Sequence, residues 1–181
     1  MARIALVGRS RTSGAAKEAF ERKIAERGNI PNMYRVFAHR PWLLTTMDAH
    51  FAAVMGSGTV PLKLKEMLAL QTSVENRSRY CTASHTILAG RTGSTPGQIA
   101  ALLDVDAGPF TDRERAALRF ALHMTRDANR VPDAVFAALR EHFDEGEIVE
   151  IAAVVGLFAY FNRFNNALGL EPTKPGEGVN S

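Results

Sequence analysis

Cysteine is nearly absent from this sequence, which contains a single one, Cys81, in 181 residues. One thiol cannot form a disulfide within the chain, which argues against a secreted fold held together by disulfides. Long hydrophobic runs are missing too. The run at 152–161 has about half the length that a bilayer requires, and the run at 4–7 is too short for the core of a signal peptide. We therefore predict a cytoplasmic protein without a membrane partner.

The patterns that bind nucleic acids and nucleotide cofactors are missing as well. The formal net charge is only +3, and the Lys and Arg residues are spread along the chain rather than gathered in a basic stripe with interleaved aromatics. No glycine-rich phosphate-binding loop follows a predicted strand. We therefore predict a small-molecule substrate, no nucleic-acid partner and no cofactor.

Helical spacing and helix caps dominate the sequence, whereas strand signals are nearly absent. Capping boxes at Thr95, Thr111 and Asp144 each predict the start of a helix. The first of these helices is predicted to end at Leu103, and the last, the longest in the chain, at about Leu168. The hydrophobic fraction of 46% is ordinary for a globular protein. We predict an all-α fold with eight or so helices.

These helices are predicted to form one domain over 1–170, with its core motif at 61–93. The composition of 171–181, which is polar and rich in glycine and proline, is typical of a mobile tail. A faint repeat aligns Glu66 with Glu147, which suggests two weakly similar helical halves of which only the first carries reactive groups. Two unrelated amphipathic segments are the alternative interpretation.

The reactive groups lie in the stretch from Glu66 to Gly93. Cys81 and His85 are four residues apart, so on a helix they share a face and can touch. A thiol beside an imidazole generates a nucleophile near neutral pH. Ser78 is the expected N-cap, which places Cys81 at the third helical position, near unpaired backbone N–H groups and the positive end of the helix dipole. We therefore expect the pKa of this thiol to lie about 1–3 units below its free value of about 8.5.

Glu66 is a lone carboxylate within an apolar helix, where it needs a partner. We expect it to orient His85 or to relay a proton. The alternatives are structural: Cys81 is a small buried hydrophobe, His85 binds a backbone carbonyl, and Glu66 pairs with Arg79 or Lys65. A metal site built from Cys81, His85 and Glu66 is not predicted, because the ligand set is incomplete.

The order of these residues resembles the carboxymuconolactone decarboxylase and AhpD-like alkylhydroperoxidase family. The redox branch of that family has a glutamate, a Cys-x-x-Cys pair, and a histidine four residues after the second cysteine. Here Ser78 lies twelve positions after Glu66, Cys81 lies three positions after Ser78, and His85 lies four positions after Cys81. The closing segment 162–170, NRFNNALGL, also resembles the larger members of the family.

This resemblance implies an AhpD-like helical fold and a homo-oligomer, either a trimer or a hexamer. The run at 152–161 is either its subunit interface or the core of each subunit. The resemblance also implies that Cys81 is the peroxidatic thiol, that His85 and Glu66 form its proton relay, and that Ser78 and Tyr80 line the site. Because Ser78 stands in the position of the resolving cysteine, an external thiol must reduce an oxidised Cys81.

Our leading hypothesis is an AhpD-like peroxidase that reduces hydroperoxides with one cysteine. One alternative is a cofactor-free lactone decarboxylase or isomerase in which His85 and Glu66 are acid and base and Cys81 is a wall of the pocket. Another alternative is a non-catalytic helical oligomer. The loss of the resolving cysteine at position 78 favours it.

Overall fold

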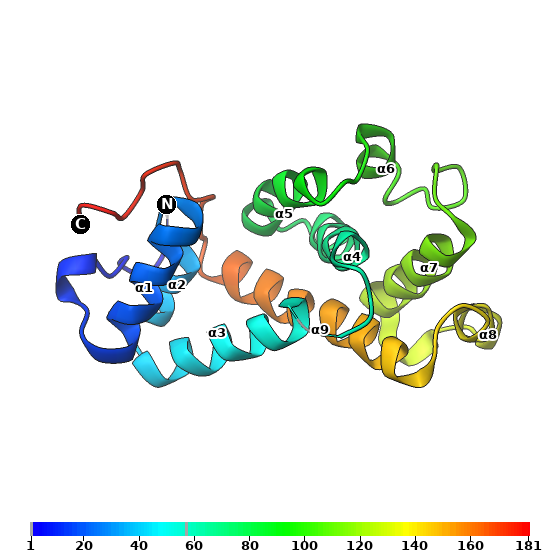
Figure 1. Cartoon of the computed structure of the whole chain (residues 1–181), viewed down its shortest axis with the longest axis horizontal. Helices are drawn as coiled ribbons and strands as arrows, with labels where there is room; N and C mark the ends of the chain where they lie inside the picture. The colour runs from blue at the N-terminus through cyan, green and yellow to red at the C-terminus, as the bar shows by residue number, and fades with distance from the viewer. Residues whose placement is uncertain (1, 57) are drawn as a thin grey trace.

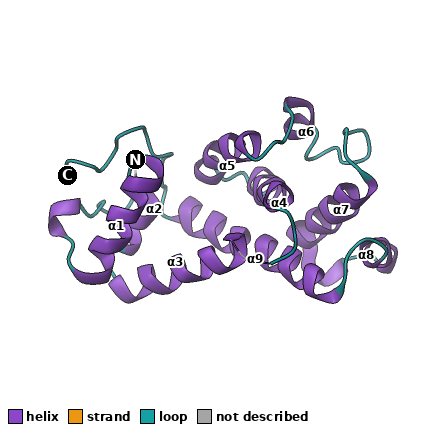
Figure 2. Ribbon diagram, in the orientation of Figure 1, coloured by secondary structure: helices purple, strands orange, loops and turns teal. Residues whose placement is uncertain are grey.

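The structure, a computed structural model, describes residues 2–56 and 58–181, and within these ranges it contains helices but no strands (Figure 1). Figure 2 shows the same helices joined by short loops. The all-α prediction is confirmed. Met1, where the predicted domain begins, and Ser57 lie outside the described residues. The helices are η1 (Arg9–Arg11), α1 (Gly14–Arg27), α2 (Asn32–Phe37), α3 (Pro41–Gly56), α4 (Leu62–Glu75), α5 (Arg79–Arg91), α6 (Pro96–Ala100), α7 (Asp112–Asp127), η2 (Ala128–Arg130), α8 (Asp133–Arg140) and α9 (Glu145–Ala167).

Local capping signals set the starts of three of these helices. In α6, α7 and α9 the side chains of Thr95, Thr111 and Asp144 each accept a hydrogen bond from the third helical residue, whose side chain bonds back to the backbone N–H of the cap. All three predicted capping boxes are confirmed. The predicted end of α6 at Leu103 is wrong, because α6 stops at Ala100. A tertiary contact accompanies this early end, since the amide of Gln71 in α4 donates to the carbonyl of Leu102 at 2.6 Å.

Helix α4 lies in the middle of the molecule, where α5, α7 and α9 pack around it (Figure 1). Ten consecutive residues, from Leu64 to Ser73, are buried. The helix is therefore enclosed on all sides, so the carboxylate of Glu66 within it must find its partner inside the protein.

The apolar run 152–161 forms the middle of α9 and belongs to the core of this chain. Val154, Val155, Leu157 and Phe158 are all buried against neighbouring helices. Phe161 is buried as well, so half of the residues in this run lie in the core, whereas Tyr160 is exposed. Among the described helices, α9 included, none combines the length and the apolar character that crossing a membrane requires.

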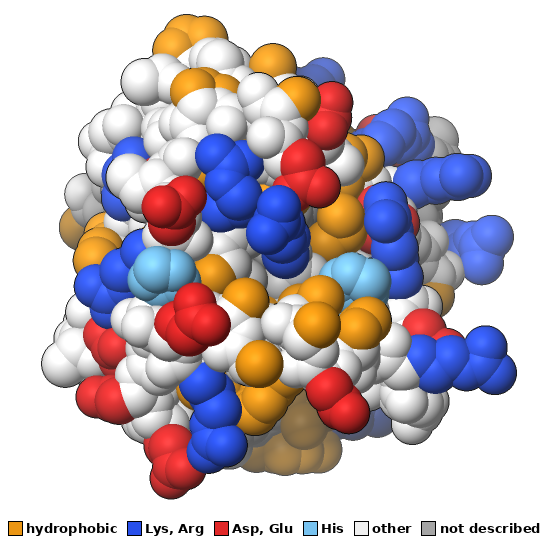
Figure 3. Space-filling view, turned by 90° about the vertical axis from the view of Figure 1, so that its right-hand side faces the viewer, with side chains coloured by type: hydrophobic (Ala, Val, Ile, Leu, Met, Phe, Trp, Pro, Cys, Tyr) orange, Lys and Arg blue, Asp and Glu red, His pale blue; other side chains and the backbone are white. Residues whose placement is uncertain are grey.

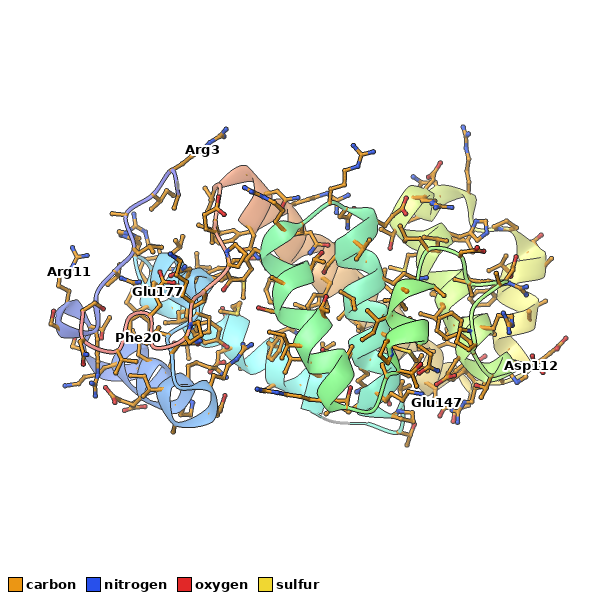
Figure 4. The ribbon with its side chains drawn as sticks, turned by 90° about the horizontal axis from the view of Figure 1, so that it is seen from above. Arg3, Arg11, Phe20, Asp112, Glu147 and Glu177 are labelled. Carbon is orange, nitrogen blue, oxygen red and sulfur yellow. The ribbon has the colours of Figure 1, made fainter. Side chains whose placement is uncertain are left out.

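The two ends of the chain lie side by side next to α1 and α2 (Figure 1). Residues 171–181, which we name the C-terminal strap, cross this part of the molecule, and Figure 4 shows Glu177 there. The backbone N–H of Ile30 donates to the carbonyl of Glu177 at 3.0 Å, and that of Asn32 donates to the hydroxyl of Thr173 at 2.8 Å. The composition of the segment suggested a mobile tail and did not indicate these contacts.

The segments aligned by the faint repeat take different forms. Around Glu66 the chain folds into two helices, α4 and α5, whereas around Glu147 it runs into the single helix α9. The similarity of the two halves therefore stays a prediction.

At the end of the molecule formed by α7 and α8, basic and acidic side chains are interspersed (Figure 3). Figure 4 shows Asp112 and Glu147 at this end. An ion pair joins α7 to α9 here, with Nη2 of Arg113 2.6 Å from Oε1 of Glu147. Charges of both signs therefore share the surface shown in Figure 3.

Candidate active site

The packing of α5 against α4 brings His85 to Glu66. Nδ1 of His85 lies 2.7 Å from Oε2 of Glu66, and both side chains are buried. The ring of Phe158 meets the imidazole edge-on, with ring centroids 4.5 Å apart. An ionised carboxylate only accepts hydrogen bonds, so Nδ1 is the donor and Nε2 is left to accept a proton. Glu66 thereby fixes both the orientation and the tautomer of the imidazole.

Cys81 is the third residue of α5, as predicted, and only 3% of it is exposed. Its sulfur accepts a hydrogen bond from Nδ2 of Asn165 in α9 at 3.3 Å. Sequence reasoning gave Asn165 no part in the site. The signal that could have identified it is the spacing of Asn162 and Asn165, which places both amides near one face of a helix that is apolar before them, because buried amides need partners.

Two buried polar atoms close to Cys81 make no hydrogen bond of standard geometry. They are Oγ of Ser78, which is fully buried at the N-cap of α5, and Oδ1 of Asn165. The Ser78 hydroxyl does not cap the helix either. A buried polar atom without a partner costs about 1–3 kcal/mol. Both atoms therefore retain hydrogen-bonding capacity beside the sulfur.

The electrostatics of Cys81 differ from the sequence prediction. Burial raises the pKa of the Cys81 thiol above its ordinary value, and the opposing effects of the Ser78 hydroxyl and the Asn165 amide do not outweigh it. The predicted lowering is wrong because desolvation disfavours the thiolate. The two nearby arginines do not compensate. Arg77 is exposed, and the side chain of Arg79 is 81% exposed and pairs with Glu171.

A network of amides joins the turn before α5 to α9. Nδ2 of Asn162 donates to the Ser73 hydroxyl at 3.1 Å, and Nδ2 of Asn76 donates to Oδ1 of Asn162 at 3.0 Å. Between these residues and the start of α5, Arg77 has a φ of +52°, which is uncommon for a residue other than glycine. The network holds this turn in place, and with it the first turn of the helix that carries Cys81.

Cys81, His85 and Tyr80 line a cavity of about 50 Å³, which we name the inner cavity. Its volume exceeds the ~10–15 Å³ that one water molecule needs but is far below the ~300–1,000 Å³ of ordinary ligand pockets. It therefore admits a reacting group of a few atoms rather than a whole organic molecule. Tyr80 is one of the wall residues of this cavity, whereas Ser78 lies next to Cys81 but outside the wall. Within the described ranges, no group of three or more His, Cys, Asp or Glu residues is arranged to hold a metal ion.

Residues of α1, α2 and α3 form a second polar network beside the inner cavity. The hydroxyl of Tyr34 donates to Oδ1 of Asp48, and Nη2 of Arg22 lies 2.8 Å from Oδ2. Burial alone would raise the pKa of Asp48, but the hydrogen bonds from Tyr34 and Arg22 and the charge of Lys23 outweigh it, so the pKa is lowered. Tyr34 and Lys23 line the inner cavity. Sequence reasoning gave this network no role.

Comparison with known proteins supports the family and the fold. The family model described as "Carboxymuconolactone decarboxylase family" matches residues 41–123, the part of the chain that holds Glu66, Cys81 and His85. The protein YdfG of Bacillus subtilis is 30% identical over 107 residues, which cover 58% of this chain and 73% of YdfG. This chain belongs to the carboxymuconolactone decarboxylase family.

Solved structures extend the likeness to nearly the whole chain. A peroxidase-related protein from Ralstonia eutropha JMP134, described as an alkylhydroperoxidase AhpD core, is 26% identical with a TM-score of 0.87. The match covers 96% of this chain and 93% of that protein. A peroxidase-related protein from Silicibacter sp. TM1040 is 25% identical with a TM-score of 0.85, over 98% of this chain and 95% of its own. The fold is therefore AhpD-like throughout, including the helices outside 41–123.

Proposed function

We propose that this protein is an AhpD-like oxidoreductase that reduces hydroperoxides with a single reactive thiol, Cys81. One observation carries the proposal: Cys81 and the Glu66-bound imidazole of His85 line the same small cavity. The likeness to peroxidase-related proteins supports the class of reaction. The size of the inner cavity suits a hydroperoxide group, which has two oxygen atoms to place beside the sulfur.

The residues have defined parts in this reaction. Nε2 of His85 accepts the proton of Cys81 as the sulfur attacks the terminal oxygen of the hydroperoxide. The O–O bond breaks, the imidazolium returns a proton to the departing oxygen, and an alcohol leaves. Cys81, oxidised by two electrons, becomes a sulfenic acid. His85, which lines the same cavity as Cys81, supplies the base that this step needs because burial raises the pKa of the thiol. Asn165 donates to the sulfur and stabilises negative charge there.

The return to the thiol needs an external reductant, because position 78 holds serine. One low-molecular-weight or protein thiol displaces the sulfenic oxygen as water and forms a mixed disulfide with Cys81. A second thiol then releases Cys81 and leaves as a disulfide with the first. A reducing cytoplasm supplies thiols of both kinds.

The test measures hydroperoxide consumption in the presence of a thiol, together with the mass of the intact protein after one equivalent of peroxide. The wild type should consume peroxide and gain one oxygen atom, and Cys81→Ser should do neither. Ser94→Ala, a change at a buried serine that sequence and structure place outside the site, is the matched control and should behave as the wild type does. A wild-type thiol that reacts with peroxide no faster than free cysteine at the same pH would overturn the proposal.

The raised pKa of Cys81 favours a second candidate, in which the thiol is a passive wall. Here His85 and Glu66 act as acid and base on a lactone or a related small carbonyl acid. This reaction predicts that Cys81→Ser keeps lactone turnover while Glu66→Gln loses it by roughly 10²–10⁴-fold. Glu75→Gln is the matched control, because Glu75 lies in the same helix and pairs with Arg126 near the surface.

We also propose that the protein assembles into a homo-oligomer, a trimer or a hexamer. Trp42 and Leu43 at the start of α3 support this, since their side chains are largely exposed although they are apolar. Sedimentation equilibrium measures the assembly directly. A monomer at micromolar concentration would refute it without bearing on the chemistry of Cys81.

A further inference from the structure

A larger pocket of about 340 Å³, which we name the outer pocket, adjoins the inner cavity. The two share Arg27, Pro31, Tyr80, Ser84 and Leu88 as wall residues. Because these wall residues are shared, the two spaces are neighbours. A molecule seated in the outer pocket can therefore extend a small group toward Cys81 and His85.

Two arginines give the outer pocket its charge. Arg27 comes from the last turn of α1 and Arg91 from the last turn of α5, and no Asp or Glu is among the wall residues. In the described part of the chain, neither guanidinium forms an ion pair. Lys23, one turn earlier in α1, differs from Arg27 in this respect, because its amine forms an ion pair with Oε2 of Glu26 at 2.7 Å. The outer pocket thus has two cationic groups available for an anion.

The rest of the wall is largely apolar. Leu88 and the exposed side chain of Ile87 come from α5, and Pro172 and Pro175 come from the C-terminal strap. Such a wall suits a hydrocarbon body, whereas a guanidinium pairs best with the two oxygens of a carboxylate. The combination of arginines and apolar wall favours a molecule that has both a carboxylate and a hydrocarbon body.

We propose that the outer pocket binds an organic acid, with its carboxylate at Arg27 and Arg91 and its apolar body along α5 and the C-terminal strap. The substrate is then an acid that carries its reacting group at a distance from the carboxylate, and this group enters the inner cavity. The inference rests on the proposed function only in taking that group to be a hydroperoxide. The binding of the acid itself does not depend on which reaction follows.

Contacts of the C-terminal strap hold the outer pocket in shape. The hydroxyl of Thr173 accepts from the backbone N–H of Asn32 and lies 3.4 Å from the hydroxyl of Tyr80. That tyrosine hydroxyl also accepts from the backbone N–H of Met33 at 3.2 Å. One hydrogen-bonded chain therefore links the strap, the start of α2 and the shared wall of the two spaces. A preformed pocket lowers the entropy cost of binding.

The experiment measures the binding of octanoate to the full chain by calorimetry, with methyl octanoate as the uncharged counterpart. Octanoate should bind and, by filling the pocket beside the inner cavity, should slow the alkylation of Cys81 by iodoacetamide. Arg27→Gln and Arg91→Gln should each weaken octanoate binding roughly tenfold, as the loss of a charge-assisted hydrogen bond predicts. Arg130→Gln is the matched control, because Arg130 is 86% exposed at the far end of the molecule.

Equal binding of octanoate and methyl octanoate would overturn the inference. So would an affinity for octanoate that stays unchanged when Arg27→Gln and Arg91→Gln are combined in one variant. All three arginines are exposed, and circular dichroism would verify that the variants keep their helix content. Turnover has no part in this measurement. If Cys81 proves inert to peroxide while octanoate still binds through the two arginines, the proposed peroxidase reaction fails and the acid-binding site stands. If peroxide is consumed but the charge of octanoate and of the two arginines makes no difference to binding, the peroxidase reaction stands and the acid-binding site fails.

Discussion

Asn165 donates a hydrogen bond to the sulfur of Cys81, which lies 84 positions earlier in the sequence, at a distance of 3.3 Å. The contact joins the long helix α9 to the first turn of α5. Since burial disfavours the thiolate, this amide is one of the few groups that oppose the cost of charge on the sulfur. The reactivity of Cys81 therefore depends on α9 as well as on its own helix.

Asn165→Ala should make Cys81 less acidic. A hydrogen bond to a charged group contributes about 1.5–3 kcal/mol, so its loss should raise the apparent pKa of the thiol by about one unit or more. The rate of alkylation by iodoacetamide at a fixed pH should fall roughly tenfold. Asn129→Ala, in the exposed η2 turn, is the control. Identical pH profiles for the wild type and Asn165→Ala would show that the amide does not act on the sulfur.

Stability should fall at alkaline pH because of Cys81. Its folded pKa is raised, so the folded chain holds the thiol proton to a higher pH than the unfolded chain does. This contribution to the free energy of unfolding is complete below the unfolded pKa of about 8.5 and is lost as the pH rises through the folded value. In thermal melts the wild type should lose stability relative to Cys81→Ala as the pH rises above about 8.5. A difference that stays constant as the pH rises would contradict the burial argument.

Ser78→Cys should convert the site into a dithiol centre. Residues three apart in the first turn of a helix are close enough for a disulfide, and Ser78 is buried beside Cys81. One equivalent of peroxide should therefore leave the intact protein two hydrogens lighter rather than one oxygen heavier, as mass spectrometry would show. Ser94→Cys is the matched control, because Ser94 is also buried with an unpartnered hydroxyl. If both variants only gain oxygen, the geometry at Ser78 does not permit the bond.

Asp48 should stabilise the fold above acid pH. Its pKa is lowered in the folded chain, so its contribution is present above the unfolded pKa of about 3.9 and is lost as the pH falls through the folded value. At pH 7, Asp48→Asn should be less stable by about 1–3 kcal/mol, and the gap should close as the pH falls below about 4. Urea unfolding measures both. Asp106→Asn, which breaks a surface pair with Arg119, should cost less than about 1 kcal/mol.

The features that could be predicted from the sequence depend on neighbours along the chain. The capping boxes at Thr95, Thr111 and Asp144 need only a partner three residues away, so a short segment contains the whole interaction. The position of Cys81 in the first turn of α5 was predicted from Ser78, which is the N-cap of this helix although its hydroxyl makes no capping hydrogen bond. The contact between Glu66 and His85 links two helices, and the family-like spacing indicated it.

The features that could not be predicted depend on packing between distant segments. The position of Cys81 near a helix N-terminus favoured a lowered pKa. The burial that raises the pKa instead comes from the packing of other helices, α9 among them. Asn165 reaches the sulfur only because α9 runs beside α5. The contacts of residues 171–181 could not be predicted, because the composition of this segment is also typical of disordered tails.

The C-terminal strap and Arg27 both lie outside the matched segment 41–123, yet they form much of the wall of the outer pocket. The helices that carry Glu66, Cys81 and His85 can therefore diverge separately from the outer pocket. Related chains can retain Glu66 and His85 while exchanging the ends of the sequence, and so acquire new substrates without rebuilding the centre. For protein engineering, the last eleven residues are accordingly the first place to diversify. A purification tag attached to them would lie close to the outer pocket.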